Sequence, residues 1–422
     1  MLLPEHEAKA LFAEYGIAVP PGRAVGSAAE AVAAARELGP PVMLKVQARV
    51  GGRGRAGGVL RCADAEAVSA AYTRLAATWP EAAGPRGVLV EAAVPAAAER
   101  YLALAVDPRL GQPVLLAAAS GGMAVEETAR DAPDALQRAP IEVGLGLQPY
   151  QAVGLLRAAG WPRARLVAAA DLAGRLYRLF REQEALLAEI NPLAETPDGG
   201  LLALDARVAV DDSALFRLPR WRDLVAADEA SFPQEALKLR YGFDYVDLDP
   251  EGTVGLLSTG AGGTMLLVDL LRARGAAPAN FVDLRTGGMR GDSTRLEVVL
   301  GRLRACTRLR AVLVSVFGGI TDVGQFAETL LQALERVGGP PEGPPADATR
   351  ASVPASDRSS ADAAAAPARP PRSPSGGAPW PLVVRLEGYG AERGLALLAA
   401  RGISTTRDLD EAIARVVALA TP

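Results

Sequence analysis

The spacing of apolar residues divides the first half of the chain into alternating helices and strands. The segments EHEAKALFAEYG (5–16) and AAEAVAAARELG (28–39) are apolar on one helical face, and each stops at a glycine. A long helical pattern also covers 161–186. Shorter apolar runs predict strands at 41–48, 87–94, 100–108 and 113–120, and on both sides of the Pro-Asp-Gly-Gly turn within 185–208.

From about Val254 the pattern becomes strand, turn and helix, repeated along the rest of the chain. The repeats cover 253–275, 310–334, 381–402 and 403–420. Such alternation predicts a parallel sheet with helices on its faces. Residues 339–379 interrupt it with a segment rich in proline, alanine, serine and glycine that has almost no large apolar side chain. We expect this segment to be a disordered insertion.

The composition is that of a globular chain with two or more domains, since it has 422 residues of which 50% are hydrophobic. A net charge of −4 gives no general attraction to nucleic acid. No apolar run is long enough to span a membrane, and the start MLLPEHEAKALF does not resemble a signal peptide. Cys62 and Cys306 are interpreted as buried thiols of a reducing compartment. We therefore expect a cytoplasmic protein without a membrane or nucleic-acid partner.

The glycine-rich stretch LKVQARVGGRGRAGGV (44–59) is the first candidate for chemistry. Residues 52–57 satisfy the pattern GxGxxG, but an extended segment follows where a dinucleotide-binding motif needs a helix. The stretch therefore predicts a hairpin tip between two strands. Glycines there can bring backbone N–H groups against phosphate oxygens, with charge supplied by Lys45, Arg53 and Arg55. From these residues alone, a phosphate-binding loop and an ordinary surface hairpin both stay open.

The hairpin AEINPLAETPDGGLLALDARV is the second candidate. Glu189 and Asn191 are two positions apart, so they share a face of the strand. Folding the hairpin about Asp198 and Gly199 places Asn191 nearly opposite Asp205, where side chains lie about 5 Å apart. An amide oxygen and a carboxylate that converge there suit Mg²⁺. The alternative is a polar strand pair on a solvated face.

Two glycine turns in the second half complete the candidates. The residues Gly-Ala-Gly-Gly (260–263) precede a helix that we expect to begin near Thr264, and a helix N-terminus favours an anion. A second turn follows a strand at Gly318, Gly319 and Ile320.

Four segments in this order resemble the beta subunit of succinyl-CoA synthetase (succinate–CoA ligase): VMLKVQARVGGRGRAGGV, LVEAAVPAAAERYLALAVD, AEINPLAETPDGGLLALDARVAVDDSALFR and SVFGGI. The resemblance extends over nearly the whole chain except 339–379. It implies an α/β protein with an N-terminal ATP-grasp domain (1–225) and a flavodoxin-like, parallel-sheet CoA-ligase domain (226–422) interrupted by the insertion. It also implies a reversible reaction of ATP, a dicarboxylic acid and CoA that gives acyl-CoA, ADP and phosphate.

The resemblance also implies roles for individual residues. Glu189 corresponds to a catalytic residue near a phosphorylated intermediate, and Asn191 and Asp205 correspond to Mg²⁺ ligands. The implied nucleotide contacts are Lys45, Gly52, Arg53, Gly54, Glu91, Val94 and Glu99. The implied contacts of the acid substrate are Thr259, Gly318, Gly319, Ile320 and Thr321. For Glu91 and Glu99, the alternative is that both are solvated surface acids.

The family's phosphorylated histidine belongs to an alpha partner subunit, which also binds most of the CoA. This chain has a single histidine, His6, which we place away from every motif and interpret as a surface or packing residue. The implied carrier of phosphate therefore lies on the partner.

Some positions depart from the family pattern. Thr259 and Ser315 stand where asparagine is common, and Asp322 follows Thr321 where arginine is frequent. These changes cluster around the acyl and phosphohistidine sites, so malate, another dicarboxylate or a non-catalytic nucleotide-binding paralogue stays open beside succinate. Pro20 carries no side-chain donor for guanine, which favours ATP over GTP.

Overall fold

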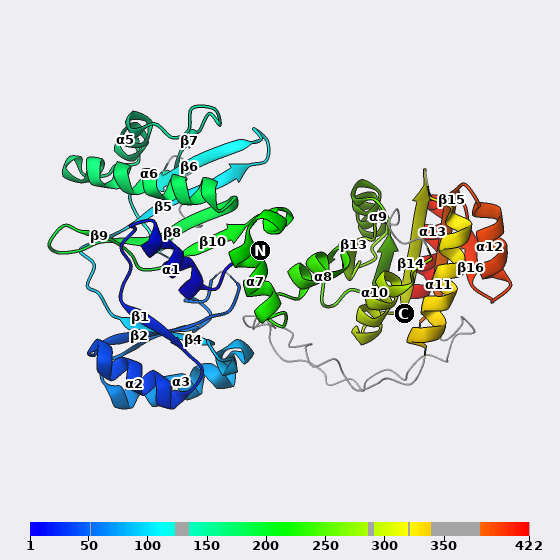
Figure 1. The fold of residues 1–422 in the computed structure, drawn as a ribbon, viewed down its shortest axis with the longest axis horizontal. Coiled ribbons are helices and arrows are strands. Elements are labelled where there is room, and N and C mark those ends of the chain that lie inside the picture. Colours follow the sequence, from blue (N-terminus) through cyan, green and yellow to red (C-terminus); the bar gives the residue numbers. More distant parts are fainter. Residues whose placement is uncertain (51, 123–134, 286–290, 320, 339–379, 422) are drawn as a thin grey trace. The chain divides into compact units, whose positions relative to one another are not determined.

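The computed structural model describes residues 1–50, 52–122, 135–285, 291–319, 321–338 and 380–421. The described chain forms two compact units that divide between Pro219 and Arg220 (Figure 1). The domain boundary expected after residue 225 falls within helix α7 (Pro219–Ala227). The predicted insertion at 339–379 and the predicted site residue Ile320 lie outside the described residues.

The first unit contains a small antiparallel sheet in the order β1-β4-β2-β3. One of its faces packs against two helices through a core that includes Leu44, Val46, Val88 and Val90. Side chains alternate along a strand, so Lys45 and Glu91 lie on the other face. The elements are β1 (Gly22–Val25), α2 (Ala28–Leu38), β2 (Val42–Val46), β3 (Val59–Cys62), α3 (Ala65–Thr78), η1 (Pro80–Ala83) and β4 (Val88–Ala92).

A larger antiparallel sheet in the same unit has the order β10-β8-β5-β6-β7, and β9 also pairs with β8. Helix α6 packs against β8 and β5, and it lies within the helical pattern predicted for 161–186. The elements are β5 (Ala98–Asp107), β6 (Gln112–Ala118), β7 (Gln137–Pro140), α5 (Pro149–Ala158), η4 (Arg163–Arg165), α6 (Leu166–Glu182), β8 (Ala185–Glu195), β9 (Leu201–Ala203), β10 (Arg207–Val210) and η5 (Asp212–Arg217).

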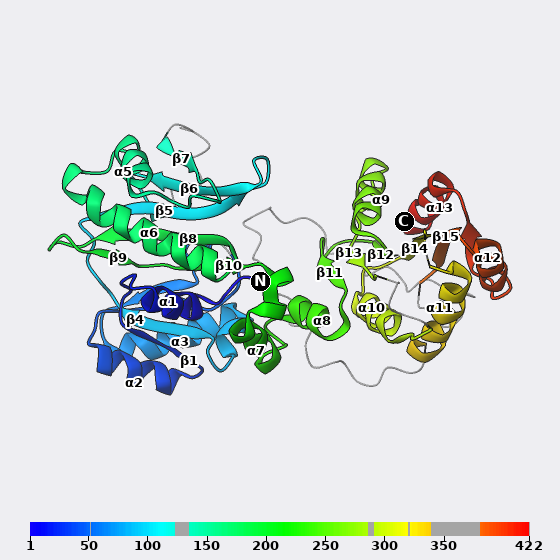
Figure 2. The same cartoon turned by 45° about the horizontal axis from the view of Figure 1, so that its top comes forward.

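Helix α1 (Glu5–Glu14) lies between these two sheets, as both orientations show (Figures 1 and 2). The residues before it pair with the edge of the larger sheet, where the Leu3 N–H donates to Val208 O at 2.9 Å. The buried face of α1 consists of Glu5, Ala8, Lys9, Leu11 and Phe12. Two charged residues are thus carried into the space between the sheets.

The second unit is built on a parallel sheet in the order β12-β14-β15-β16. Strand β13 lies beside β12, and the Asn280 carboxamide bonds both backbone groups of Leu256 at 2.9 Å. The spatial order β13-β12-β14-β15-β16 is the doubly wound, flavodoxin-like order. The elements are α8 (Pro233–Tyr241), β11 (Asp244–Asp247), β12 (Val254–Ser258), α9 (Ala261–Ala273), β13 (Asn280–Asp283), α10 (Thr294–Ala305), β14 (Ala311–Gly318), α11 (Val323–Val337), β15 (Leu382–Gly388), α12 (Ala391–Ala399), β16 (Ser404–Thr406) and α13 (Leu409–Ala420).

Helices cover both faces of this sheet, which confirms the predicted parallel α/β arrangement. Ala311 and Leu313 belong to the core with α9 and α13, whereas Val312 and Val314 belong to the core with α10, α11 and α12. The expected start of α9 near Thr264 is wrong, because the helix begins at Ala261. Gly260 has a positive φ of 83° that turns the chain directly into the helix, so the following glycines form its first turn. None of the helices in the described ranges has the length and apolar character needed to cross a membrane.

Candidate functional site

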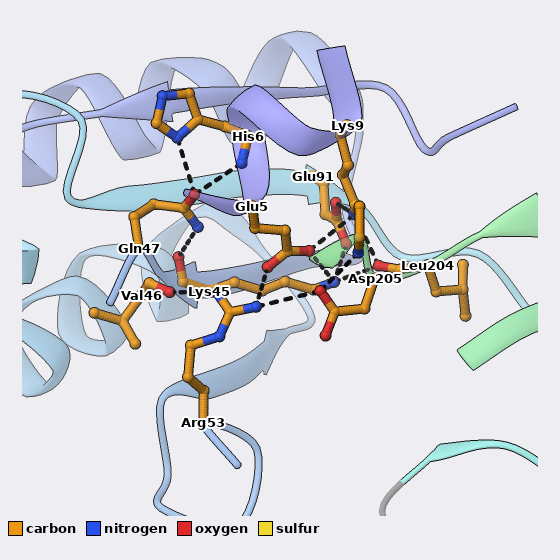
Figure 3. Close-up of polar contacts among 11 residues, drawn as sticks. Glu5, His6, Lys9, Lys45, Val46, Gln47, Arg53, Glu91, Leu204 and Asp205 are labelled. Atoms are coloured by element: carbon orange, nitrogen blue, oxygen red, sulfur yellow. Dashed lines mark hydrogen bonds and ion pairs between the residues drawn. The ribbon is translucent and has the colours of Figure 1, made fainter. Parts of the chain in front are cut away.

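A cluster of charged side chains fills the space between the two sheets of the first unit (Figure 3). It joins segments that are far apart in the sequence: helix α1, strands β2 and β4, the β2–β3 loop and the chain between β9 and β10. Its members are Glu5, Lys9, Lys45, Arg53, Glu91 and Asp205.

Lys45 lies at the centre of this charged cluster and is only 7% exposed. Its Nζ contacts Glu5 Oε1 at 3.0 Å, Glu91 Oε1 at 2.6 Å and Leu204 O at 2.6 Å. These acceptors match the three N–H groups of an ammonium. Burial opposes its charge, but the carboxylates of Glu5 and Glu91 outweigh burial and raise the pKa of Lys45. Lys45 therefore stays protonated in the folded protein.

Strand register explains why Glu91 meets Lys45. Met43 of β2 faces Glu91 of β4, and Lys45 faces Leu89, so Lys45 and Glu91 are diagonal neighbours on one face. Glu91 is 2% exposed and also pairs with Lys9. The alternative of a solvated surface acid is therefore wrong for Glu91. Glu99 differs, because it is exposed at the start of β5.

Glu5 and Lys9 are members of the cluster that the sequence analysis did not predict. Lys9 Nζ lies 3.1 Å from Glu5 Oε1 and donates to Leu204 O at 2.7 Å. Burial would raise the pKa of Glu5, but Lys45, Lys9 and Arg53 outweigh it and hold that pKa well below its usual range. A sequence signal existed, since Glu5, Ala8, Lys9 and Phe12 follow the spacing of one helical face. Two charges on that otherwise apolar face indicate a buried ion pair.

The glycine-rich stretch forms the tip of the β2–β3 hairpin, as predicted. The tip is a compact turn, in which the Ala56 N–H donates to Gly52 O at 3.1 Å and the Gly58 N–H donates to Arg53 O at 2.8 Å. Gly52 and Gly54 are exposed, and Gly52 has a positive φ of 74°.

Arg53 points from this tip into the charged cluster. Its Nη2 lies 2.8 Å from Glu5 Oε2 and 3.2 Å from Asp205 Oδ1, and its Nη1 donates to Val46 O at 2.8 Å. Arg53 therefore joins the hairpin tip to α1 and to the proposed metal ligand.

The register of the second hairpin agrees with the prediction from sequence. Glu189 pairs with Arg207, and Leu193 pairs with Ala203. Between these two pairs, Asn191 lies on β8 and Asp205 lies in the connection between β9 and β10. Asn191 Oδ1 accepts a hydrogen bond from the Gly122 N–H at 2.6 Å, which fixes its carboxamide.

Asp205 is the most accessible carboxylate of the charged cluster, with 36% of its side chain exposed against 1% for Glu5 and 3% for Glu91. Desolvation and the charge of Glu5 raise the pKa of Asp205 to about 6, although Arg53 and Lys45 partly offset this effect. A nearby cation would favour its charged form.

The donor set of this hairpin fits Mg²⁺ better than a metal held by protein alone. Within the described ranges, no group of three or more His, Cys, Asp or Glu side chains is arranged to hold a metal. Asn191 and Asp205 offer one amide oxygen and one carboxylate. Mg²⁺ commonly takes few protein oxygens and completes its coordination with phosphates and water. The pair therefore suits a Mg²⁺–nucleotide complex.

Glu189 is half-buried on the same strand as Asn191. The Tyr101 hydroxyl, on a residue that is 6% exposed, donates to Glu189 Oε2 at 3.1 Å. This bond from the neighbouring strand β5 orients the carboxylate. Tyr101 was not predicted as a site residue, because its position two residues after Glu99 gives no signal for a contact with β8.

The expectation that His6 lies away from every motif is wrong. His6 follows Glu5 on α1, and its Nδ1 lies 2.9 Å from Oε1 of Gln47, the residue directly after strand β2. Its backbone N–H donates to the same oxygen at 2.9 Å. The ring is thus packed beside the charged cluster, which agrees with the interpretation of His6 as a packing residue.

The predicted substrate residues lie in the second unit at the carboxyl ends of neighbouring strands. Thr259 follows β12, Gly318 ends β14, and Gly319 and Thr321 follow it. The helices after β12 and β14 pack on opposite faces of the sheet, which defines the switch point where such folds bind ligands. Val94 lies in the first unit, in the connection between β4 and β5.

The paired antiparallel sheets, with a cationic hairpin tip facing a carboxylate hairpin, define the ATP-grasp class, and residues 2–195 match the family model described as an ATP-grasp domain. The chain is 35% identical over 430 residues to a succinate–CoA ligase [ADP-forming] subunit beta of Acidithiobacillus ferrooxidans, with 100% of both chains covered. It is 37% identical over 340 residues to a succinate–CoA ligase [GDP-forming] subunit beta of Thermus thermophilus, covering 79% of this chain and 87% of that one. The chain belongs to the succinate–CoA ligase beta-subunit family.

A solved structure supports the fold over both units. ATP citrate lyase from Methanothrix soehngenii, in complex with citrate and coenzyme A, matches with a TM-score of 0.62. The match covers 96% of this chain and 95% of that chain at 16% identity. The predicted fold class, an ATP-grasp domain followed by a flavodoxin-like domain, is confirmed.

Proposed function

We propose that this chain is the nucleotide-binding beta subunit of an acid–CoA ligase that couples ATP and ADP to the formation or cleavage of an acyl-CoA. The observation that carries the proposal is the convergence of Lys45, Arg53 and Asp205, from separate segments, in one buried charged cluster. Phosphoryl transfer needs fixed cations around the phosphates, because charge stabilisation and positioning supply most of the catalysis.

The nucleotide would bind with its phosphates beside this cluster and the β2–β3 hairpin tip. Lys45 and Arg53 would face the phosphates, and Gly52 and Gly54 would lie at the hairpin tip. Because Lys45 already has three acceptors, a phosphate oxygen has to replace one of them. The residues proposed to contact the rest of the nucleotide are Glu91, Val94 and Glu99.

Asn191 and Asp205 would hold Mg²⁺, which when bound neutralises charge on the phosphate oxygens. Glu189, oriented by Tyr101, would accept a hydrogen bond from the imidazole N–H of a partner's histidine and hold that ring in one orientation.

The second unit would bind the dicarboxylate at Thr259, Gly318, Gly319, Ile320 and Thr321. The N-terminus of α9, which begins at Ala261, offers backbone N–H groups for the phosphoryl group of the partner. An alpha subunit would bring the phosphorylated histidine and most of the CoA site. Relatives that form ADP and relatives that form GDP are both similar to this chain, so the preference for ATP stays a prediction. The cytoplasmic location is also a prediction.

The test is to purify the chain with its alpha partner and to measure CoA-dependent ADP or GDP release with succinate, malate and other dicarboxylates. With ATP labelled at the γ-phosphate, we expect acid-labile label on the partner and none on the isolated chain. His6→Ala should leave this labelling unchanged, because the ring packs against Gln47. Stable label on this chain alone, lost in His6→Ala, would contradict the assigned roles. Nucleotide binding without turnover on any acid would instead support a non-catalytic paralogue.

A further inference from the structure

Arg53 is held by two carboxylates that differ in their surroundings. Glu5 projects from α1 with 1% of its side chain exposed, whereas Asp205 lies between β9 and β10 with 36% exposed (Figure 3). If Asp205 binds a metal ion, Arg53 loses that partner and keeps Glu5.

We propose that Glu5 is a positioning residue of the nucleotide site, which keeps Lys45 and Arg53 directed at the phosphates when Asp205 turns to Mg²⁺. The inference rests on the proposed function and adds to it a residue that touches neither the nucleotide nor the metal.

The contacts of Glu5 support this role. Its Oε1 lies 3.0 Å from Lys45 Nζ and 3.1 Å from Lys9 Nζ, and its Oε2 lies 2.8 Å from Arg53 Nη2. Glu91 pairs with the two lysines, and Asp205 pairs with Arg53. Glu5 therefore links the cation of strand β2 to the cation of the hairpin tip.

The placement of Glu5 makes it a rigid anchor. It is the first residue of α1, where the helix dipole favours a negative charge. The helix is fixed by its buried residues Ala8, Leu11 and Phe12. Arg53, in contrast, extends from a glycine-rich tip whose backbone has more conformational freedom. An arginine held in place before binding loses less side-chain entropy when phosphate arrives.

Charge balance gives Lys9 a separate role. Glu5, Glu91 and Asp205 face Lys9, Lys45 and Arg53, so the cluster holds equal numbers of ionisable acids and bases. Lys9 lies one helical turn after Glu5 and contacts both buried carboxylates. It offsets their charge without being needed at the phosphates.

The test uses Glu5→Gln in the complex of the full chain with its alpha partner. Glutamine has the size of glutamate and lacks the charge that holds the cations. Binding of Mg²⁺–ATP and of adenosine is measured for each protein by calorimetry or by displacement of a fluorescent nucleotide. We expect Mg²⁺–ATP to bind at least about tenfold more weakly, as for a lost charge-assisted hydrogen bond. Adenosine, which has no phosphate, should bind within about twofold of wild type.

Glu14→Gln is the matched control, since Glu14 lies on the exposed face of the same helix and undergoes the same chemical change. It should bind both ligands as wild type does. If Glu5→Gln does not fold, Glu5→Asp keeps the charge and withdraws it from Arg53 by one methylene. Glu5→Asp should again weaken the binding of Mg²⁺–ATP and leave the binding of adenosine unchanged.

Two results would overturn the positioning role of Glu5: unchanged affinity for Mg²⁺–ATP, or an equal loss for ATP and adenosine. Failure of the wild-type complex to bind any nucleoside triphosphate would instead refute the proposed function, and this inference with it.

Discussion

The proposed metal site leads to a prediction about Asp205→Asn, a change that keeps the size of the side chain and removes its charge. Asp205 Oδ1 accepts the Ala206 N–H at 2.8 Å and lies 3.2 Å from Arg53 Nη2. Asparagine keeps one oxygen that can accept from Ala206. Arg53 keeps Glu5 and Val46 O as partners. The substitution therefore removes a metal ligand and leaves most of the packing intact.

The expected effects on folding and on binding differ in size. A partly exposed ion pair contributes about 0–1 kcal/mol, so the free energy of unfolding should change by less than about 1 kcal/mol. A second reason also makes the loss of stability small. Burial and Glu5 raise the pKa of Asp205 to about 6, so the folded protein disfavours the charge that the substitution removes. Changes to outer-shell partners of metals cost about 10–100-fold in affinity, and loss of a direct ligand should cost at least about tenfold.

The assay is nucleotide binding as a function of Mg²⁺ concentration, with a parallel series in a chelator and urea unfolding to verify the fold. Asp198→Asn is the control, because Asp198 is exposed at the tip of the same hairpin. Asp205→Asn should need at least about tenfold more Mg²⁺ for half-maximal binding. An unchanged Mg²⁺ requirement in the folded variant would refute the metal assignment. An equal loss in the chelator would place the effect on the contact with Arg53 instead.

Two further predictions concern Glu189 and Glu5. Tyr101→Phe removes the hydroxyl that orients Glu189, so single-turnover phosphorylation of the partner should slow by about tenfold while nucleotide affinity stays the same; an unchanged rate would exclude the orienting role. The folded-state pKa of Glu5 lies below its ordinary value of 4.5, so its contribution to stability is present above that pH and is lost as pH falls through the lower folded value. The difference in unfolding free energy between wild type and Glu5→Gln should therefore shrink below about pH 4.5, and urea titrations in which it stays constant would contradict the ion-pair account.

The parts of the site that could be predicted from sequence depend on local pattern. The turn at Asp198 and Gly199 and the alternation along its strands determine which residues face each other, so the opposition of Asn191 and Asp205 followed from the sequence. The hairpin tip around Arg53 followed in the same way, because extended segments flank the glycines. The place of β13 beside β12 was harder to predict, since the Asn280 side chain joins them and backbone bonds form at the two ends of β13.

The site residues that could not be predicted depend on packing between segments that are distant in the sequence. Glu5 and Lys9 enter the site because α1 inserts between two sheets. The carbonyl oxygen of Leu204, between β9 and β10, accepts hydrogen bonds from both lysines. The motifs that resemble a known family do not include Glu5 and Lys9 either, because α1 has no glycine loop and no spacing typical of metal ligands. Its helical periodicity showed a buried face, but it did not show which sheet that face would meet.

Differences in burial within the charged cluster indicate the order in which its partners exchange when a nucleotide binds. The Lys45 ammonium already has three acceptors, so a phosphate oxygen has to replace Glu5, Glu91 or the Leu204 carbonyl. Asp205 is not one of these acceptors, because it pairs with Arg53. Glu5 and Glu91 are nearly inaccessible, whereas the side chain of Asp205 is 36% exposed. Desolvation and the charge of Glu5 raise the pKa of Asp205 to about 6, so its charged form is disfavoured. Mg²⁺ at Asp205 would favour its charged form and weaken its hold on Arg53. Metal and nucleotide should therefore bind cooperatively, because the ion that takes Asp205 also frees the arginine that the phosphates need.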